Sequence, residues 1–232
     1  MTRVSRRGAI AASTQAAAAS APVLFQTTFG QFTNSNSFGT STTASGAVDL
    51  SAYSGIPNLA LVMALNWYAN GGGTTTFGCS YNGVAATLMG GQDRSGGANY
   101  GSQLWIFPNP PTDGSHTLAG IQSSGTNTGR NIWLMAWLWS NVGGYDNVVS
   151  APGIASGAAI TIPAGPNQVA VNAMAAGQTM SNYSQTQRAA STVANTLRGM
   201  AGDAAGDASG SKDFSTTGGT YHSVGARLLP AA

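Results

Sequence analysis

Few side chains in this sequence are suited to acid–base or nucleophilic chemistry. It has two histidines, His116 and His222, one cysteine, Cys79, and seven aspartates, and it lacks glutamate. The motifs that arrange such residues for catalysis are absent from it: there is no G-x-S-x-G turn, H-E-x-x-H helix, Walker loop or G-x-G-x-x-G. Both histidines lie in predicted strands without a carboxylate at a motif position, so we expect structural roles for them. We expect Cys79 to be a small buried strand residue, and the chain not to be an enzyme.

A calcium site is a second chemical possibility. Asp203, Asp207 and Asp213 lie in or beside a Gly- and Ser-rich stretch, and carboxylate oxygens are ligands that Ca²⁺ prefers. Their spacings of four and six residues do not match the alternating positions of an EF-hand loop. A solvated turn is therefore the favoured interpretation, and we expect no metal and no cofactor. Residues 182–184, Asn-Tyr-Ser, fit the short pattern of a glycosylation site, which is weak evidence alone.

The residues best suited to binding are tryptophans. The segment Asn131–Ser140, NIWLMAWLWS, contains three of the five. As a strand it places Trp133, Trp137 and Trp139 on one face with Met135, and aliphatic residues on the other, so both faces are apolar. The tryptophan face therefore needs cover, from another segment of the chain, a neighbouring subunit or a flat sugar ring. Cover from the same chain is the favoured alternative, and the three tryptophans are also candidate interface residues.

Composition restricts the class of partner. Charged residues make up 7% of the 232, hydrophobic residues 42%, and the formal net charge is +2. Three of the nine basic residues, Arg3, Arg6 and Arg7, lie in the first seven positions, so the remainder is nearly neutral. This argues against a specific nucleic-acid groove. The short periodic apolar runs exclude disorder, and the three arginines are candidates for contact with a neighbouring protein.

The N-terminal segment has two interpretations. Its arginine pair and alanine-rich stretch resemble a twin-arginine export signal. Polar residues at positions 13 to 15 interrupt the apolar region, so we expect residues 1–22 to be a retained arm, extended or partly helical across Ala9–Ala19. Such an arm would become ordered by lying on other subunits. No run approaches the ~18 apolar residues of a membrane span, and we expect no membrane partner.

Residues 23–232 are predicted to form one β domain. Alternating apolar runs predict strands at 23–29, 59–68, 77–81, 84–89, 103–107, 115–121, 131–140, 158–162, 168–175, 213–217 and 221–229. Asn82-Gly83 between two such runs predicts a type I′ hairpin. Glycine and small residues predict loops at 31–46, 142–157 and 199–210, and 185–197 fits a strand or a helix. The pattern predicts an all-β, antiparallel β-sandwich or a jelly-roll-like fold.

Four motifs between residues 59 and 231 carry a family resemblance. They are Tyr81–Ala85 with Thr87-Leu88, Leu104–Pro111 with Gly114–Thr117, Gln185–Arg188, and Val224–Ala231. Together they resemble a β-sandwich domain family that recurs in bacteriophage virion proteins and in large secreted bacterial proteins. Because these are turn and core motifs, the resemblance implies a fold and a structural or adhesive role without a shared catalytic site. The chain departs from the family in its alanine-rich arm and in an apolar segment, Leu134–Trp139, where a more polar outer face is expected.

The combined expectation is a non-enzymatic structural protein of a bacteriophage virion. It would decorate or cement the capsid, or belong to the tail or a fibre, and act through subunit contacts. Its expected partners are other virion proteins, such as the major capsid protein or tail subunits, and copies of itself in a homo-oligomer. The alternative is a secreted carbohydrate-binding or adhesive β-sandwich module, for which the arm would be the export signal.

Overall fold

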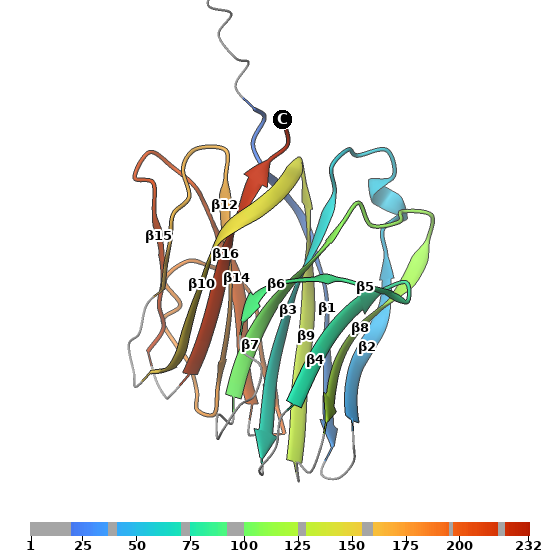
Figure 1. Ribbon diagram of the computed structural model, residues 1–232, viewed down its shortest axis with the longest axis vertical. Helices are drawn as coiled ribbons and strands as arrows, with labels where there is room; N and C mark the ends of the chain where they lie inside the picture. The colour runs from blue at the N-terminus through green and yellow to red at the C-terminus, as the bar shows by residue number, and fades with distance from the viewer. Residues whose placement is uncertain are drawn as a thin grey trace, which may run out of the picture.

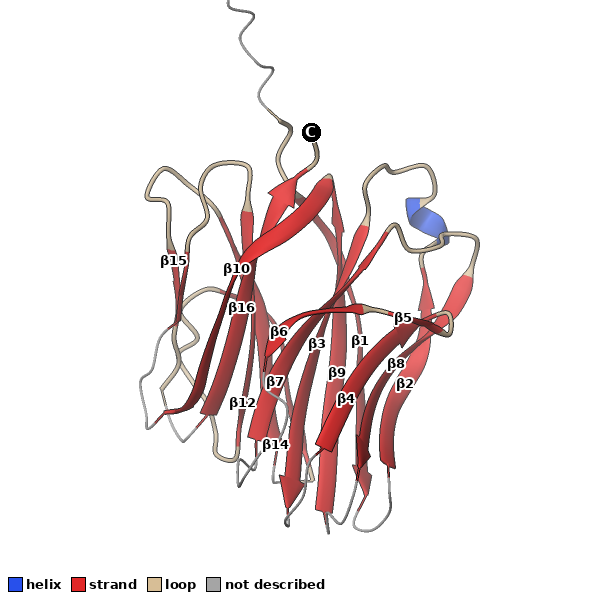
Figure 2. Cartoon of the chain, in the orientation of Figure 1, coloured by secondary structure: helices blue, strands red, loops and turns tan. Residues whose placement is uncertain are grey.

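The protein folds into stacked antiparallel sheets. The computed structural model describes residues 20–36, 41–70, 75–91, 100–124, 129–154, 160–194, 197–217 and 221–232. Almost all of the regular secondary structure in the described residues is strand (Figure 2), and all strand pairs among them are antiparallel. The predicted all-β antiparallel sandwich is therefore confirmed.

A five-stranded sheet, called here the central sheet, lies in the middle of the stack (Figure 1). Its strand order is β1 (Leu24–Asn36), β9 (Gly129–Ser140), β3 (Ala60–Asn70), β7 (Tyr100–Pro108) and β6 (Thr87–Gly91). The tryptophan strand β9 pairs with β1 on one side and with β3 on the other. Since β3 and β9 are apolar on both faces, this sheet needs a covering layer on each side.

A four-stranded sheet covers the aliphatic face of β9. Its order is β2 (Ser41–Asp49), β8 (Ser115–Ser124), β4 (Thr75–Tyr81) and β5 (Val84–Ala85). The side chains buried between the two sheets come from both, and include Leu61, Met63, Leu65, Leu134, Leu138, Val48, Cys79 and Leu118. A single 3-10 turn, η1 (Ser51–Tyr53), follows β2.

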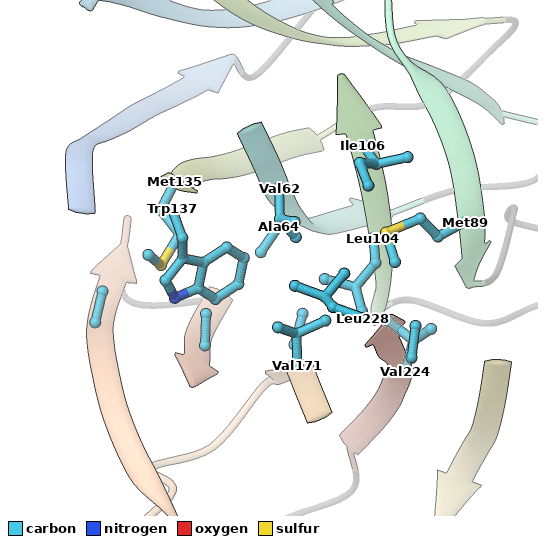
Figure 3. Packing of buried hydrophobic residues seen from close by; sticks show 14 of the residues in the cluster. Val62, Ala64, Met89, Leu104, Ile106, Met135, Trp137, Val171, Val224 and Leu228 are labelled. Carbon is cyan, nitrogen blue, oxygen red and sulfur yellow. The ribbon is translucent and has the colours of Figure 1, made fainter. Parts of the chain in front are cut away.

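The C-terminal sheet covers the other face of the central sheet. Its order is β10 (Val142–Ile154), β16 (Tyr221–Pro230), β12 (Val169–Ala176), β14 (Leu197–Ala205) and β13 (Thr186–Val193). The core between these sheets contains the tryptophan face of β9. Figure 3 shows part of this core, in which labelled residues of the central sheet face labelled residues of the C-terminal sheet: Val62, Ala64, Leu104, Trp137, Val171, Val224 and Leu228.

A small fourth layer packs outside the C-terminal sheet. Strands β11 (Ile160–Ile162) and β15 (Lys212–Phe214) pair with each other. They bury Phe214 and two isoleucines against Met174 and its neighbours on the outer face of that sheet. The order of layers is thus four-stranded, central, C-terminal and two-stranded, and both faces of β9 lie in the interior (Figure 1).

Three segments predicted as loops are strands instead. β1 continues to Asn36 and β2 begins at Ser41, within 31–46; β10 occupies most of 142–157, and β14 most of 199–210. In β2 and β14, glycines lie against aromatic rings, Gly46 against Phe32 and Gly202 against Tyr183, a role that glycine composition does not distinguish from a turn. A Cβ at Gly199 would lie 2.5 Å from a ring carbon of Trp133. The ambiguous segment 185–197 is largely the strand β13.

The predicted hairpin is confirmed at Asn82 and Gly83. Both residues have positive φ, 52° and 73°, as a type I′ turn requires. The turn joins β4 to β5, and the backbone N–H of Asn82 donates to the carbonyl of Thr117 at 3.0 Å. This anchors the turn to β8.

The N-terminal arm lies mostly outside the described residues, and with it Arg3, Arg6, Arg7 and the predicted helix at Ala9–Ala19. The described part, from Ser20, is not helical and lies against turns of the same chain. The Asn167 side chain donates to the Ser20 carbonyl at 3.0 Å, and the Asn141 side chain donates to the Pro22 carbonyl at 3.2 Å. The end of the arm that joins β1 is therefore held by the sandwich itself.

Candidate interaction surface

The three candidate tryptophans lie inside the chain. Trp133 and Trp137 are 0% exposed and Trp139 is 2% exposed. The Trp133 indole donates to Gln31 Oε1 at 3.3 Å, and the Trp139 ring meets Phe25 edge to face with centroids 5.4 Å apart. Their assignment as interface residues is corrected, because the C-terminal sheet covers their face and the rings cannot reach another protein or a sugar. Of the alternatives, cover from the same chain is the one observed.

A charged pair lies at one edge of the core between the central and C-terminal sheets. The Arg188 guanidinium on β13 donates to both carboxylate oxygens of Asp203 on β14, with 3.0 Å between Nη2 and Oδ1. Arg188 also stacks over Phe25, 3.7 Å from its ring centroid. Burial raises the pKa of Asp203, and the hydrogen bonds and charge of Arg188 act against that rise. The pair therefore joins β13 and β14 to β1 as a structural element.

The three aspartates considered for calcium are not brought together. Asp203 is held by an arginine, Asp207 pairs with Lys212, and Asp213 accepts from the Thr161 hydroxyl. The hydrogen bonds of Lys212 and then Ser209 lower the pKa of Asp207 to about 2. Over the described ranges, no three histidine, cysteine or acidic side chains are grouped so that they can hold a metal ion.

His116 forms an exposed pair that the sequence motifs did not indicate. Its Nε2 lies 2.6 Å from Oδ1 of Asp113, three residues earlier, so a carboxylate is present beside this histidine after all. The hydrogen bond to His116 is the largest cause that lowers the pKa of Asp113. The imidazole also meets the Tyr81 ring edge to face, with centroids 5.6 Å apart. These contacts fix the turn before β8.

His222 is buried between the central and C-terminal sheets. The Ser102 backbone N–H donates to Nδ1 at 3.1 Å, so Nδ1 is unprotonated and Nε2 carries the proton. That Nε2 lies 3.1 Å from the Ser150 hydroxyl, which can accept it. Desolvation lowers the pKa of His222 from 6.5 to about 4. The neutral ring links β7, β10 and β16, and its position indicates a structural role.

Two of the five exposed large apolar side chains, Leu88 and Val148, lie on the edge strands where β6 meets β10, and we call this surface the apolar seam. It consists of Val148 and Tyr145 on β10, Pro108 on β7 and Leu88 on β6, while Ile106 on β7 is buried. Leu88 lies opposite Trp105, so its side chain projects from the face of the central sheet that points toward the four-stranded sheet. Leu88 and Val148 are each 40% exposed. The Tyr145 hydroxyl donates to the Leu88 carbonyl at 3.5 Å, so edge strands of two different sheets lie side by side.

A hollow of about 360 Å³ adjoins the apolar seam. This volume is within the range of ligand and side-chain pockets. Among the described residues, no charged side chain lines it; the lining includes Ala60, Thr87, Ile106, Pro108, Val142 and Tyr145. Val142 and Tyr145 also pack against the core between the central and C-terminal sheets, so the hollow opens at the margin of that core. An apolar side chain from a partner would be desolvated there.

The two edge strands are irregular, which determines how a partner can bind. β6 has a register shift between Leu88 and Gly90, and β10 has three shifts in its pairing with β16. Bulges interrupt the row of backbone groups that a new strand needs for pairing. The seam is therefore suited to side-chain docking and poorly suited to strand addition.

The sequence carries a weak signal for this surface. Val148 and Val149 are consecutive in a polar segment. If such a segment is a strand, consecutive side chains point to opposite faces. Val149 packs beneath the two-stranded sheet, and Val148 lies against Gly90 of β6 and is 40% exposed. Assigning 142–157 as a loop concealed this.

Comparison with models of known families, with curated proteins and with solved structures gave no match. No helix within the described residues is long and apolar enough to cross a membrane. The family resemblance and the virion setting therefore stay predictions.

Proposed function

We propose that this chain is a non-enzymatic structural protein of a bacteriophage virion, a capsid decoration or cement protein or a tail or fibre component. It acts by binding another virion protein, or another copy of itself, through the apolar seam. The observation that carries the proposal is an apolar hollow at the margin of the core, lined in part by edge strand β10, which also carries exposed Val148. The virion setting itself comes from the family resemblance.

Two properties of the molecule support this role. The stacked sheets provide a rigid body, since the interior of the central sheet is covered on both faces. The surface has few charges, so covering it with another protein requires little desolvation of ionic groups. A patch that combines exposed aliphatic residues and a pocket is typical of protein contact sites.

Incorporation into particles tests the proposal. Leu88→Asp and Val148→Asp place a charge in the seam, and Ile121→Asp, at a residue 38% exposed on β8 of the four-stranded sheet, is the matched control. Particles would be purified from the phage that encodes the chain and the protein quantified by mass spectrometry. We expect the wild type and Ile121→Asp to be present and the seam variants to be lost, with all variants folded by circular dichroism.

If all variants are incorporated equally, the apolar seam is not the contact surface. Absence of the wild-type protein from particles would overturn the virion role. In that case, an intact mass from the natural source lacking about the first twenty residues, with the protein free in the medium, would indicate the secreted adhesive module instead.

A further inference from the structure

A second hollow, of about 480 Å³, lies on the outer face of the C-terminal sheet. Its polar lining includes Arg198 on β14, Thr192 on β13 and Thr179, which follows β12. Met180 and Met200 line it as well and are buried in the core beneath the two-stranded sheet. The hollow thus combines a cation, two hydroxyls and a polarisable apolar floor.

The strand register explains why these residues meet. Thr192 lies directly opposite Arg198 in the antiparallel pair of β13 and β14, and Ala190 lies opposite Met200. Opposite residues in such a pair project from the same face of a sheet. The four side chains therefore share the outer face, where β13 is the edge strand.

The charge of Arg198 is not neutralised by an aspartate. Three other described basic side chains are paired with aspartates: Arg188 with Asp203, Lys212 with Asp207 and Arg227 with Asp146. Arg198 forms no such pair within the described chain, and its buried Nη1 lacks a hydrogen-bond partner there. Among the described residues, no acidic side chain lines the hollow. A partly buried guanidinium without a counter-ion favours an anion in this place.

We propose that this hollow binds a small ligand that carries an oxyanion: a carboxylate, sulfate or phosphate group. The guanidinium presents parallel N–H donors that match such a group, and the Thr179 and Thr192 hydroxyls supply further donors. The methionine floor accommodates an alkyl chain or the face of a sugar ring attached to the anion. The volume suits a ligand of monosaccharide size. The site is separate from the apolar seam and is tested on the isolated protein.

The experiment is a titration followed by NMR, using the Arg198 Nε–H, the Thr192 amide and the methyl groups of Met180 and Met200. The probes are glucuronate, inorganic sulfate, inorganic phosphate and uncharged glucose, at constant ionic strength. We expect glucuronate to shift these signals saturably and glucose to leave them unchanged. If sulfate or phosphate binds as tightly as glucuronate, the oxyanion site stands and the inorganic ion is its ligand. If sulfate and phosphate both bind more weakly than glucuronate, the sugar ring also contributes to the affinity.

Variants separate this site from nonspecific attraction. Arg198→Gln should lower the affinity for glucuronate about tenfold or more, which is the expected loss for a charge-assisted hydrogen bond. The affinity of Arg198→Lys should lie between those of Arg198→Gln and the wild type. Lys212→Gln removes a cation outside the hollow and should leave affinity unchanged. The proposal is overturned if glucose binds as well as glucuronate, if Arg198→Gln binds normally, or if no probe shifts the signals.

Discussion

At the residue scale, the groups that usually carry chemistry are used here to join layers. His222 accepts from a backbone N–H of the central sheet and contacts a hydroxyl of β10, and its position requires a neutral ring. Arg188 and Asp203 form a pair at the edge of the same interior. Cys79 packs between the central and four-stranded sheets. Burial lowers the pKa of His222 and raises that of Cys79, so pH and thiol reagents should report on folding.

Acid should destabilise the protein through His222. Its pKa is 6.5 when unfolded and about 4 when folded, so the unfolded state binds more protons between these values. The free energy of unfolding should therefore fall as pH drops from 6.5 towards 4, by up to about 3 kcal/mol. Urea unfolding at several pH values measures this. In His222→Gln, the free energy of unfolding should change less between pH 6.5 and 4. If it changes as much as in the wild type, groups other than His222 cause the acid sensitivity.

The Cys79 thiol should be inert in the native protein. It is buried, and desolvation raises its pKa, so the reactive thiolate is not populated. An aromatic disulfide reagent at mildly alkaline pH should label no thiol in the folded chain and one thiol per chain in guanidinium. Labelling of the folded protein at the rate of a free cysteine would contradict the packing described for β4.

At the element scale, the sequence predicted strands well where large apolar residues recur in short runs, and poorly where glycine and alanine replace them. The Asn82-Gly83 hairpin and β9 follow from local pattern alone. β14 does not, because its glycines and alanines resemble a turn until Trp133 is seen lying against Gly199. The apolar seam and the Arg198 hollow combine residues distant in sequence, and such surfaces depend on strand register, which composition does not specify.

The close approach of Trp133 to Gly199 gives a direct test. Gly199→Ala would place Cβ 2.5 Å from the indole, so we expect a loss of stability of about 1–3 kcal/mol. Gly78→Ala is the control, since no atom lies within 4 Å of its added methyl group and its stability should change by less than about 0.5 kcal/mol. Urea unfolding measures both. Adding Trp133→Phe should recover part of the loss, and strict additivity of the two changes would show that the ring is not the cause.

At the scale of the whole molecule, the central sheet is shared by two cores. The chain up to Ser140 builds the central and four-stranded sheets, and the C-terminal sheet then covers the tryptophan face. Without that sheet, Trp133 and Trp137 would face water, so the N-terminal layers depend on the C-terminal ones. The central sheet should therefore open only when the whole chain unfolds, whereas the edges of the covering layers can open locally.

Hydrogen exchange tests this order. β3 and β9 each lie between two other strands and beneath covering layers on both faces. Their amides should exchange only when the whole chain unfolds, whereas edge strand β13 and the two-stranded sheet should open locally and exchange faster. Mass spectrometry of peptides from each strand measures the rates. If β3 and β9 exchange faster than the strands that cover them, the shared central sheet is not what holds the stack together.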